Sequence, residues 1–167
     1  MSEPGAPWWE GCVIYQVMPR SFADANGDGI GDLAGITARL PYLDWLGVDV
    51  LWLTPIYPSP LRDGGYDITD FTAIHPDLGD LDDLRELLTQ AHALGIRVLL
   101  DLVLNHTSVL HPWFQRARWA PRGSPERDFF VWSDDDRGYG DAPVLFRHFE
   151  HSNWEWDAVA GQYFLHR

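Results

Sequence analysis

Basic side chains are scarce in this sequence, and lysine is absent. All 12 basic residues are arginine, whereas 25 residues are acidic, so the formal net charge of the 167-residue chain is −13 at pH 7. Nucleic acids and anionic membrane surfaces attract proteins with basic surfaces. The charge therefore argues against both as partners. The absence of lysine indicates a bias of the source genome rather than a functional device.

Cysteine and long apolar runs are scarce as well. Cys12 is the only cysteine, so no intramolecular disulfide is possible and nothing points to an oxidising compartment. No apolar stretch is long enough to span a bilayer, and residues 1–7 lack the basic and apolar regions of a secretory signal peptide. We therefore expect a cytoplasmic protein, and the sequence leaves its oligomeric state open.

What the sequence does contain is an alternation of strand and helix patterns. Three apolar runs predict strands, at 12–18, 48–53 and 96–106. Apolar residues at helical spacing predict two intervening helices, at 33–46 and 81–94, with Asp32 and Asp80 as N-caps. This order predicts two βαβ units with parallel strands.

The third predicted strand ends in polar residues. The run 96–106 is nearly continuously apolar, which is typical of a central parallel strand buried on both faces. Asp101, Asn105 and His106 lie within and just past its C-terminal part, where α/β sheets place their ligands. The alternative is a capped strand end in which these side chains satisfy nearby backbone groups.

Residues 24–32 form a loop rich in oxygen-bearing side chains and glycine. Asp24, Asn26, Asp28 and Asp32 place oxygen ligands at alternating residues along it, as a hard cation requires. The loop begins like an EF-hand, but the position of the bidentate glutamate is Gly35 and a strand leads in, so an EF-hand is rejected. An Asp/Asn/Gly turn that binds nothing is the alternative to a calcium site.

A second glycine-containing loop, Asp63-Gly-Gly-Tyr66-Asp67, follows the second predicted strand. It lies on the same C-terminal face of the sheet as His106, where (β/α)8 enzymes assemble their sites. A glycine turn decorated with solvated acids is an equally good interpretation of these residues alone.

The pattern Asp101-x-x-x-Asn105-His106 after a hydrophobic strand resembles the first signature of the alpha-amylase family of glycoside hydrolases. The resemblance runs from Trp9 to the end of the chain. It implies an α/β fold: the first three βα units of a (β/α)8 TIM barrel, followed by the start of a small irregular α+β inserted domain. Because such a barrel needs about 250 residues, we expect a truncated, N-terminal fragment with a disordered lead-in at 1–8, a partial barrel at 9–106 and the inserted domain at 107–167.

The resemblance also implies a substrate site for small alpha-glucosides such as maltose and trehalose. In the family, the residue matching Tyr66 stacks under the non-reducing glucose and the one matching His106 bonds its 6-hydroxyl. In exo-acting members, the residue matching Asp63 pairs with a distant arginine and holds the terminal hydroxyls. Asp101 and Asn105 are implied to shape the floor of the site.

Family members with a loop like 24–32 bind a structural calcium ion. The implied ligands here are the side chains of Asp24, Asn26, Asp28 and Asp32 and the carbonyl of Ile30.

The groups that break the glycosidic bond are not found. Retaining glycosidases need a carboxylate nucleophile and a second carboxylic acid, which the family takes from the fourth and fifth strands, the nucleophile within Gly-x-Arg-x-Asp. No Arg-x-Asp occurs here, so we expect no catalytic residue in this chain and no activity from it alone.

Three interpretations of the complete protein remain. The runs 59–68, 152–154 and 162–167 are most similar to family members that interconvert maltose and trehalose through a glucosyl-enzyme. Exo-acting alpha-glucosidases and oligo-1,6-glucosidases are the next most similar. A non-catalytic scaffold is a third possibility, against which the retained Asp63, Tyr66 and His106 argue.

Overall fold

The computed structural model describes residues 7–144 and 151–166. The chain divides into two compact units, Met1–Val103 and Leu104–Arg167. The sequence predicts a boundary after residue 106, and the assignment of the two parts to a barrel and an inserted domain stays a prediction. Most of the predicted lead-in at 1–8 lies outside the described residues.

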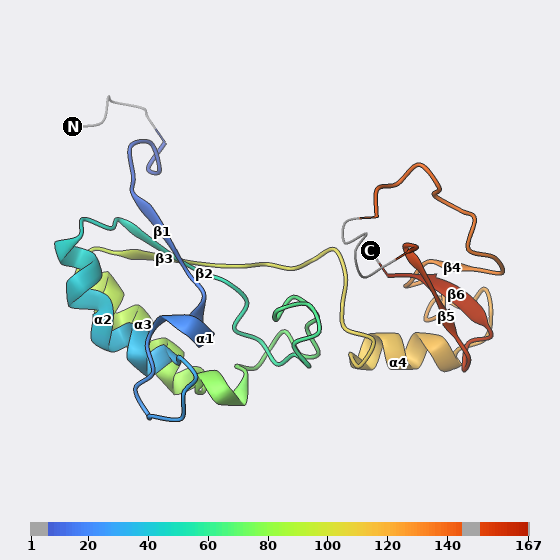
Figure 1. Ribbon diagram of the computed structural model, residues 1–167, viewed down its shortest axis with the longest axis horizontal. Helices are drawn as coiled ribbons and strands as arrows, with labels where there is room; N and C mark the ends of the chain where they lie inside the picture. Colours follow the sequence, from blue (N-terminus) through green and yellow to red (C-terminus); the bar gives the residue numbers. More distant parts are fainter. Residues whose placement is uncertain (1–6, 145–150, 167) are drawn as a thin grey trace. The chain divides into compact units, whose positions relative to one another are not determined.

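Three parallel strands form the sheet of the first unit (Figure 1). They are β1 (Ile14–Val17), β2 (Val50–Leu53) and β3 (Arg97–Leu100), in the order β1-β2-β3. Ile14 pairs with Val50, and Val50 with Arg97, both in parallel register. The predicted parallel pairing is therefore confirmed, although each strand is shorter than its apolar run.

Two helices connect these strands and pack against each other (Figure 1). α2 (Leu33–Trp45) joins β1 to β2, and α3 (Leu81–Ala93) joins β2 to β3. Asp32 caps α2 by accepting a hydrogen bond from a backbone N–H of its first turn, and Asp80 forms a capping box with Asp83. Both predicted N-caps are confirmed. The core they enclose contains Leu33, Ile36, Leu40 and Leu43 of α2, Leu51 and Leu53 of β2, and Leu87 and Ala91 of α3.

The central strand of this sheet is β2, and β3 lies at an edge. β2 is mostly buried, whereas Leu99 and Leu100 of β3 are each 39% exposed. Beyond the strand, Leu102 and Leu104 are 69% and 79% exposed. The prediction of a central strand at 96–106, buried on both faces, is therefore wrong. No strand among the described residues pairs with the outer side of β3. Val98 packs against the core, but the exposed Leu99 and Leu100 are not covered by a further layer of side chains.

Two short helices interrupt the segments that the sequence predicts as loops. α1 (Pro19–Phe22) follows β1 directly, with proline at its first position. The one-turn 3₁₀ helix η1 (Pro76–Leu78) lies late in the long connection between β2 and α3. Both are too short to show a helical apolar repeat, which explains why periodicity does not predict them.

The second unit consists of one helix and a three-stranded antiparallel sheet. His111 is the N-cap of α4 (Pro112–Trp119), and its ring nitrogen accepts a hydrogen bond from the N–H of Trp113. The sheet has the order β4-β6-β5, with β4 (Trp132–Ser133), β5 (Trp154–Asp157) and β6 (Gln162–Leu165). Phe114 of α4 packs against Phe130, Trp132 and Phe164 to form an aromatic core.

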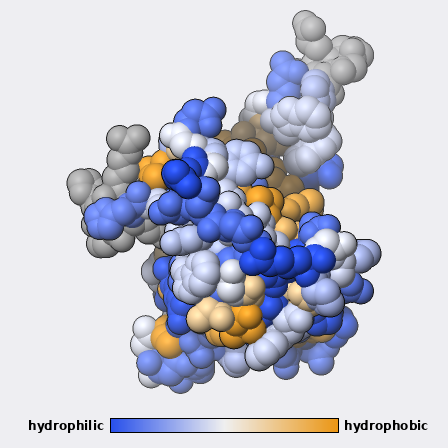
Figure 2. Space-filling view, turned by 90° about the vertical axis from the view of Figure 1, so that its right-hand side faces the viewer, coloured by the Kyte–Doolittle hydropathy of each residue, from blue (hydrophilic) through white to orange (hydrophobic). Residues whose placement is uncertain are grey.

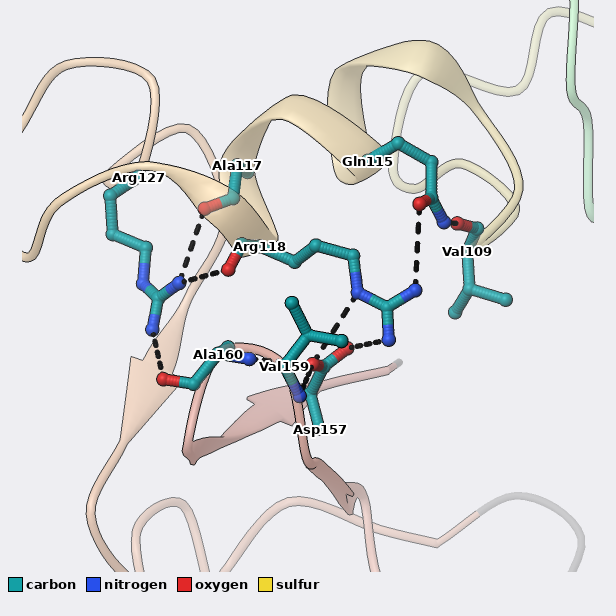
Figure 3. Close-up of polar contacts among 8 residues, drawn as sticks. All are labelled: Val109, Gln115, Ala117, Arg118, Arg127, Asp157, Val159 and Ala160. Atoms are coloured by element: carbon teal, nitrogen blue, oxygen red, sulfur yellow. Dashed lines mark hydrogen bonds and ion pairs between the residues drawn. The ribbon is translucent and has the colours of Figure 1, made fainter.

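Arg127 ties this helix to the sheet from a position that is only 3% exposed. Its guanidinium donates hydrogen bonds to the carbonyls of Ala117, Arg118 and Ala160 (Figure 3) and to the side chain of Gln162, at 2.8–3.2 Å. The same group lies 4.1 Å from the ring centroid of Trp132. Burial lowers the pKa of Arg127, and four acceptors stabilise the buried cation in place of an acidic partner.

A second arginine holds the turn between β5 and β6. Arg118 forms an ion pair with the buried carboxylate of Asp157, with 2.9 Å between Nη2 and Oδ2 (Figure 3). Oδ1 of Asp157 also accepts hydrogen bonds from the N–H groups of Val159 and Ala160. The turn is therefore fixed to α4 through one carboxylate.

Polar and charged side chains cover most of the molecular face in Figure 2, between small hydrophobic areas. Within residues 7–144 and 151–166, no helix combines the length and apolar character needed to cross a membrane.

Replacing Arg127 with methionine should destabilise the second unit. The change removes four hydrogen bonds to buried or half-buried acceptors, and we expect a loss of about 2–4 kcal/mol in the free energy of unfolding. Denaturant titration followed by tryptophan fluorescence measures it. The matched control is Arg122→Met, which removes an exposed ion pair with Asp134 and should cost less than about 1 kcal/mol. Equal stability of the two variants would contradict the role given to Arg127.

Candidate functional site

The candidate site lies at the C-terminal edge of the parallel sheet. Because all three strands run in the same direction, the loops that follow them leave from one edge. Asp63 and Tyr66 belong to the loop after β2, and Asp101 is the first residue after β3. The predicted residues of the first unit are therefore carried by neighbouring segments.

The carboxylate of Asp101 accepts one hydrogen bond on each oxygen. The Tyr66 hydroxyl donates to Oδ2 at 2.8 Å, and the Trp52 indole N–H donates to Oδ1 at 2.7 Å. The strand register explains the second contact, since Trp52 pairs with Leu99 and Asp101 lies two residues further along, on the same face. The Asp101 N–H donates to the Leu53 carbonyl at 3.2 Å, which continues the ladder by one residue.

The phenol of Tyr66 is kept in its neutral form. Burial raises its pKa to about 12, helped by the hydrogen bond to Asp101 and by the negative charges of Asp101 and Asp63. Burial and the charge of Asp101 also raise the pKa of Tyr57, whose hydroxyl donates to the Asp101 carbonyl at 3.4 Å. Both phenols therefore act as hydrogen-bond donors at neutral pH.

Sequence reasoning does not identify Trp52 and Tyr57 as part of this cluster. Trp52 lies inside an apolar strand and resembles a core residue, and Tyr57 lies in a proline-rich segment. A half-buried indole or phenol normally finds an acceptor for its polar hydrogen. The signal in the sequence that could have identified them is Asp101, the nearest carboxylate after the strand that pairs with that of Trp52.

Asn105 and His106 belong to the second unit. The Asn105 amide nitrogen lies 3.3 Å from Nδ1 of His106. Neither residue is in a strand, because β3 ends at Leu100, so the prediction that the polar residues lie partly within the strand is wrong. That His106 meets Asp63 and Tyr66 around one sugar stays a prediction.

The 24–32 loop is wound around its own side chains. The Asp24 carboxylate accepts hydrogen bonds from the N–H groups of Gly27 and Gly29 at 2.7 and 2.8 Å. These bonds lower the pKa of Asp24, and the bond from Gly29 has the largest effect. Asn26 accepts from the N–H of Asp28 in the same way.

The remaining predicted side-chain ligands, Asp28 and Asp32, also accept hydrogen bonds from nearby backbone N–H groups. Asp28 accepts from the Ile30 N–H at 2.8 Å, and Asp32 accepts from Ala25 while it caps α2. Gly29 has a φ of +89°, a left-handed conformation that glycine adopts without strain. Among the described residues, no group of three histidine, cysteine, aspartate or glutamate side chains is arranged to hold a metal ion.

Comparison with protein families gives a match to "Alpha amylase, catalytic domain" over residues 16–167. Among curated proteins, a trehalose synthase from Pimelobacter sp. (strain R48) is 52% identical over 160 residues, which is 96% of this chain and 28% of that protein. A probable alpha-glucosidase from Rhizobium meliloti (strain 1021) is 48% identical over 164 residues, which is 98% of this chain and 30% of that protein. The chain thus spans less than a third of the length of these relatives.

Among solved structures, the trehalulose synthase MutB from Pseudomonas mesoacidophila MX-45 superposes with a TM-score of 0.88 at 44% identity. The match covers 98% of this chain and 29% of that one. Other structures of MutB contain glucose, isomaltulose or sucrose.

The Tyr66→Phe variant should lose the phenol that ionises near pH 12. Because the pKa in the folded protein lies above the ordinary value of about 10, the stabilisation from Tyr66 is complete below pH 10 and is lost as the pH rises through about 12. Absorbance after rapid pH jumps measures the ionisation. Tyr139→Phe, in the second unit, is the control and should keep the step near pH 12. If Tyr66→Phe loses an ionisation step near pH 10 and keeps the step near pH 12, the assignment is contradicted.

Proposed function

Because this chain belongs to the alpha-amylase family, we propose that it forms the N-terminal part of a retaining enzyme that acts on small alpha-glucosides. In this proposal the first unit is the first three βα units of a (β/α)8 barrel, and the second begins the inserted domain. The observation that carries the proposal is the hydrogen bond between Tyr66 and Asp101, with Asp63 in the same loop. Such a constellation at the C-terminal edge of parallel strands is where barrel enzymes bind substrate.

The residues of this chain would bind the terminal glucose rather than break its bond. Tyr66, held in place by Asp101, offers a ring on which a sugar can stack. Asp63 and His106 accept or donate hydrogen bonds to its hydroxyls, and Asp101 and Asn105 shape the floor. The nucleophile and the general acid that a retaining glycosidase requires match no residue of this chain, so the chain alone should be inactive.

Isomerisation of maltose to trehalose is the preferred reaction, as the identity to the Pimelobacter trehalose synthase supports. In that reaction a glucosyl-enzyme forms and the released glucose attacks it again through another hydroxyl. An exo-acting alpha-glucosidase, which admits water at this step, is the alternative supported by the Rhizobium meliloti relative. The cytoplasm is the proposed compartment for either enzyme.

The loop 24–32 is proposed as a calcium site. The alternation of oxygen-bearing residues supports this proposal, while in the structure the carboxylates of Asp24 and Asp28 accept hydrogen bonds from N–H groups of the loop itself. Asp24, Asn26, Asp28 and Asp32 would supply side-chain oxygens and Ile30 its carbonyl. The cation would add rigidity to the segment between β1 and α2, and it would take no part in the reaction.

Calcium should bind this loop with modest affinity, since Gly35 replaces the bidentate glutamate of an EF-hand. Calorimetric titration of the chain with calcium should give heat that Asp28→Ala abolishes. The matched control is Asp44→Ala, an exposed aspartate on α2 outside the loop, which should leave the heat unchanged. Equal heats from the parent chain and Asp28→Ala would refute the site.

The complete enzyme should act on the non-reducing end of small alpha-glucosides, and Asp63 should be needed for it. Charge-assisted hydrogen bonds are worth about 1.5–3 kcal/mol each, so Asp63→Ala should lower kcat/KM for maltose at least about tenfold. Because these bonds matter most in the transition state, kcat should fall as well.

Maltose and soluble starch are assayed side by side, with the products resolved as trehalose, glucose or oligosaccharides. Trehalose as the main product supports the isomerase, and glucose alone supports the glucosidase. Internal cleavage of starch at a comparable rate is the result that would overturn the exo-acting proposal.

A further inference from the structure

The loop that carries Asp63 and Tyr66 closes on itself. The N–H and hydroxyl of Thr69 both donate to the carbonyl of Pro58, at 2.8 and 3.0 Å. Between these ends the backbone takes left-handed conformations, with φ of +61° at Leu61 and +106° at Gly65. A left-handed leucine is strained and persists only when its surroundings hold it. Something inside the loop must therefore fix its path.

The carboxylate of Asp67 is the group at the centre of this loop. It accepts hydrogen bonds from the hydroxyl of Ser59 at 2.5 Å, from the N–H of Arg62 at 3.1 Å and from the N–H of Asp63 at 3.3 Å. The Ser59 oxygen in turn accepts from the N–H of Leu61 at 2.9 Å. One side chain thus fixes the strained segment on both sides of Leu61.

No ion pair in the described parts of the chain involves Asp67. Its three partners are neutral donors, two of them backbone amides, as in a carboxylate used to organise a loop. Asp67 also follows Tyr66 directly, and one of its donors is the N–H of Asp63. Asp67 therefore holds the backbone at the point from which the Asp63 side chain leaves it.

We propose that Asp67 is a positioning residue that sets the direction of Asp63 toward the terminal glucose. This inference rests on the proposed function and deepens it by assigning the loop's internal carboxylate to substrate specificity. Asparagine at this position would keep the size of the side chain and would turn an N–H₂ group toward an N–H donor. The loop would then lose at least one of its three internal bonds.

A double-mutant cycle in the complete enzyme tests the proposal. Asp67→Asn should lower kcat/KM for maltose about tenfold, as expected if Asp63 no longer makes its charge-assisted hydrogen bond to the terminal glucose. In the Asp63→Ala background the same change should cost less than about threefold, because the contact it positions is already gone. Ser59→Ala, which removes one donor and leaves both amide bonds, should give a smaller loss than Asp67→Asn.

Thermal unfolding midpoints of all variants provide the structural control. A merely structural role would lower the midpoint and reduce kcat/KM by the same factor in both backgrounds, and this result overturns the inference. If Asp67→Asn does not fold, the cycle is run with Ser59→Ala and Asp63→Ala. The inference is then overturned if Ser59→Ala lowers kcat/KM by the same factor with and without Asp63→Ala. An unmodified enzyme that does not turn over maltose refutes the proposed function, whereas normal turnover with independent effects refutes only the role of Asp67.

Discussion

The parallel pairing of β2 with both of its neighbours is the constraint on which the first unit depends. β2 is mostly buried and hydrogen-bonded on both sides, so its direction fixes the edge from which every following loop leaves. The register then decides which side chains meet there. Because Trp52 pairs with Leu99, its indole N–H reaches the carboxylate of Asp101 two residues further on. A shift by one residue would turn Trp52 to the opposite face and break this contact.

Neutral donors hold the carboxylates of the site. Asp101 is bound by an indole and a phenol, and Asp67 by a hydroxyl and two amides, so neither charge is cancelled by an ion pair among the described residues. Burial, together with the hydrogen bond to Asp101 and the charges of Asp101 and Asp63, raises the pKa of Tyr66 and keeps its phenol protonated at neutral pH. A site built in this way has fixed acceptors for sugar hydroxyls, which suits the binding role proposed for Asp63 and Tyr66.

Local features were predictable from the sequence, and features that depend on spatial neighbours were not. The caps at Asp32 and Asp80 follow from side chains within one helical turn. The apolar character of β3 says nothing about which strand lies beside it, and for that reason it was wrongly predicted as a central strand buried on both faces. The contact of Trp52 with Asp101 joins residues 49 positions apart, and only the strand register brings them together. The composition of residues 24–32 predicted a loop, whereas the hydrogen bonds inside it could not be predicted from the sequence.

The most direct test of the central claim is a crystal structure of the complete enzyme with glucose bound. The account predicts that the Tyr66 ring stacks on the sugar, and that Asp63 and His106 lie within hydrogen-bonding distance of its hydroxyls. Asp101 should keep its bonds to Trp52 and Tyr66. Glucose bound in the barrel with none of Asp63, Tyr66 and His106 in contact would contradict the claim that this chain forms the terminal-glucose site.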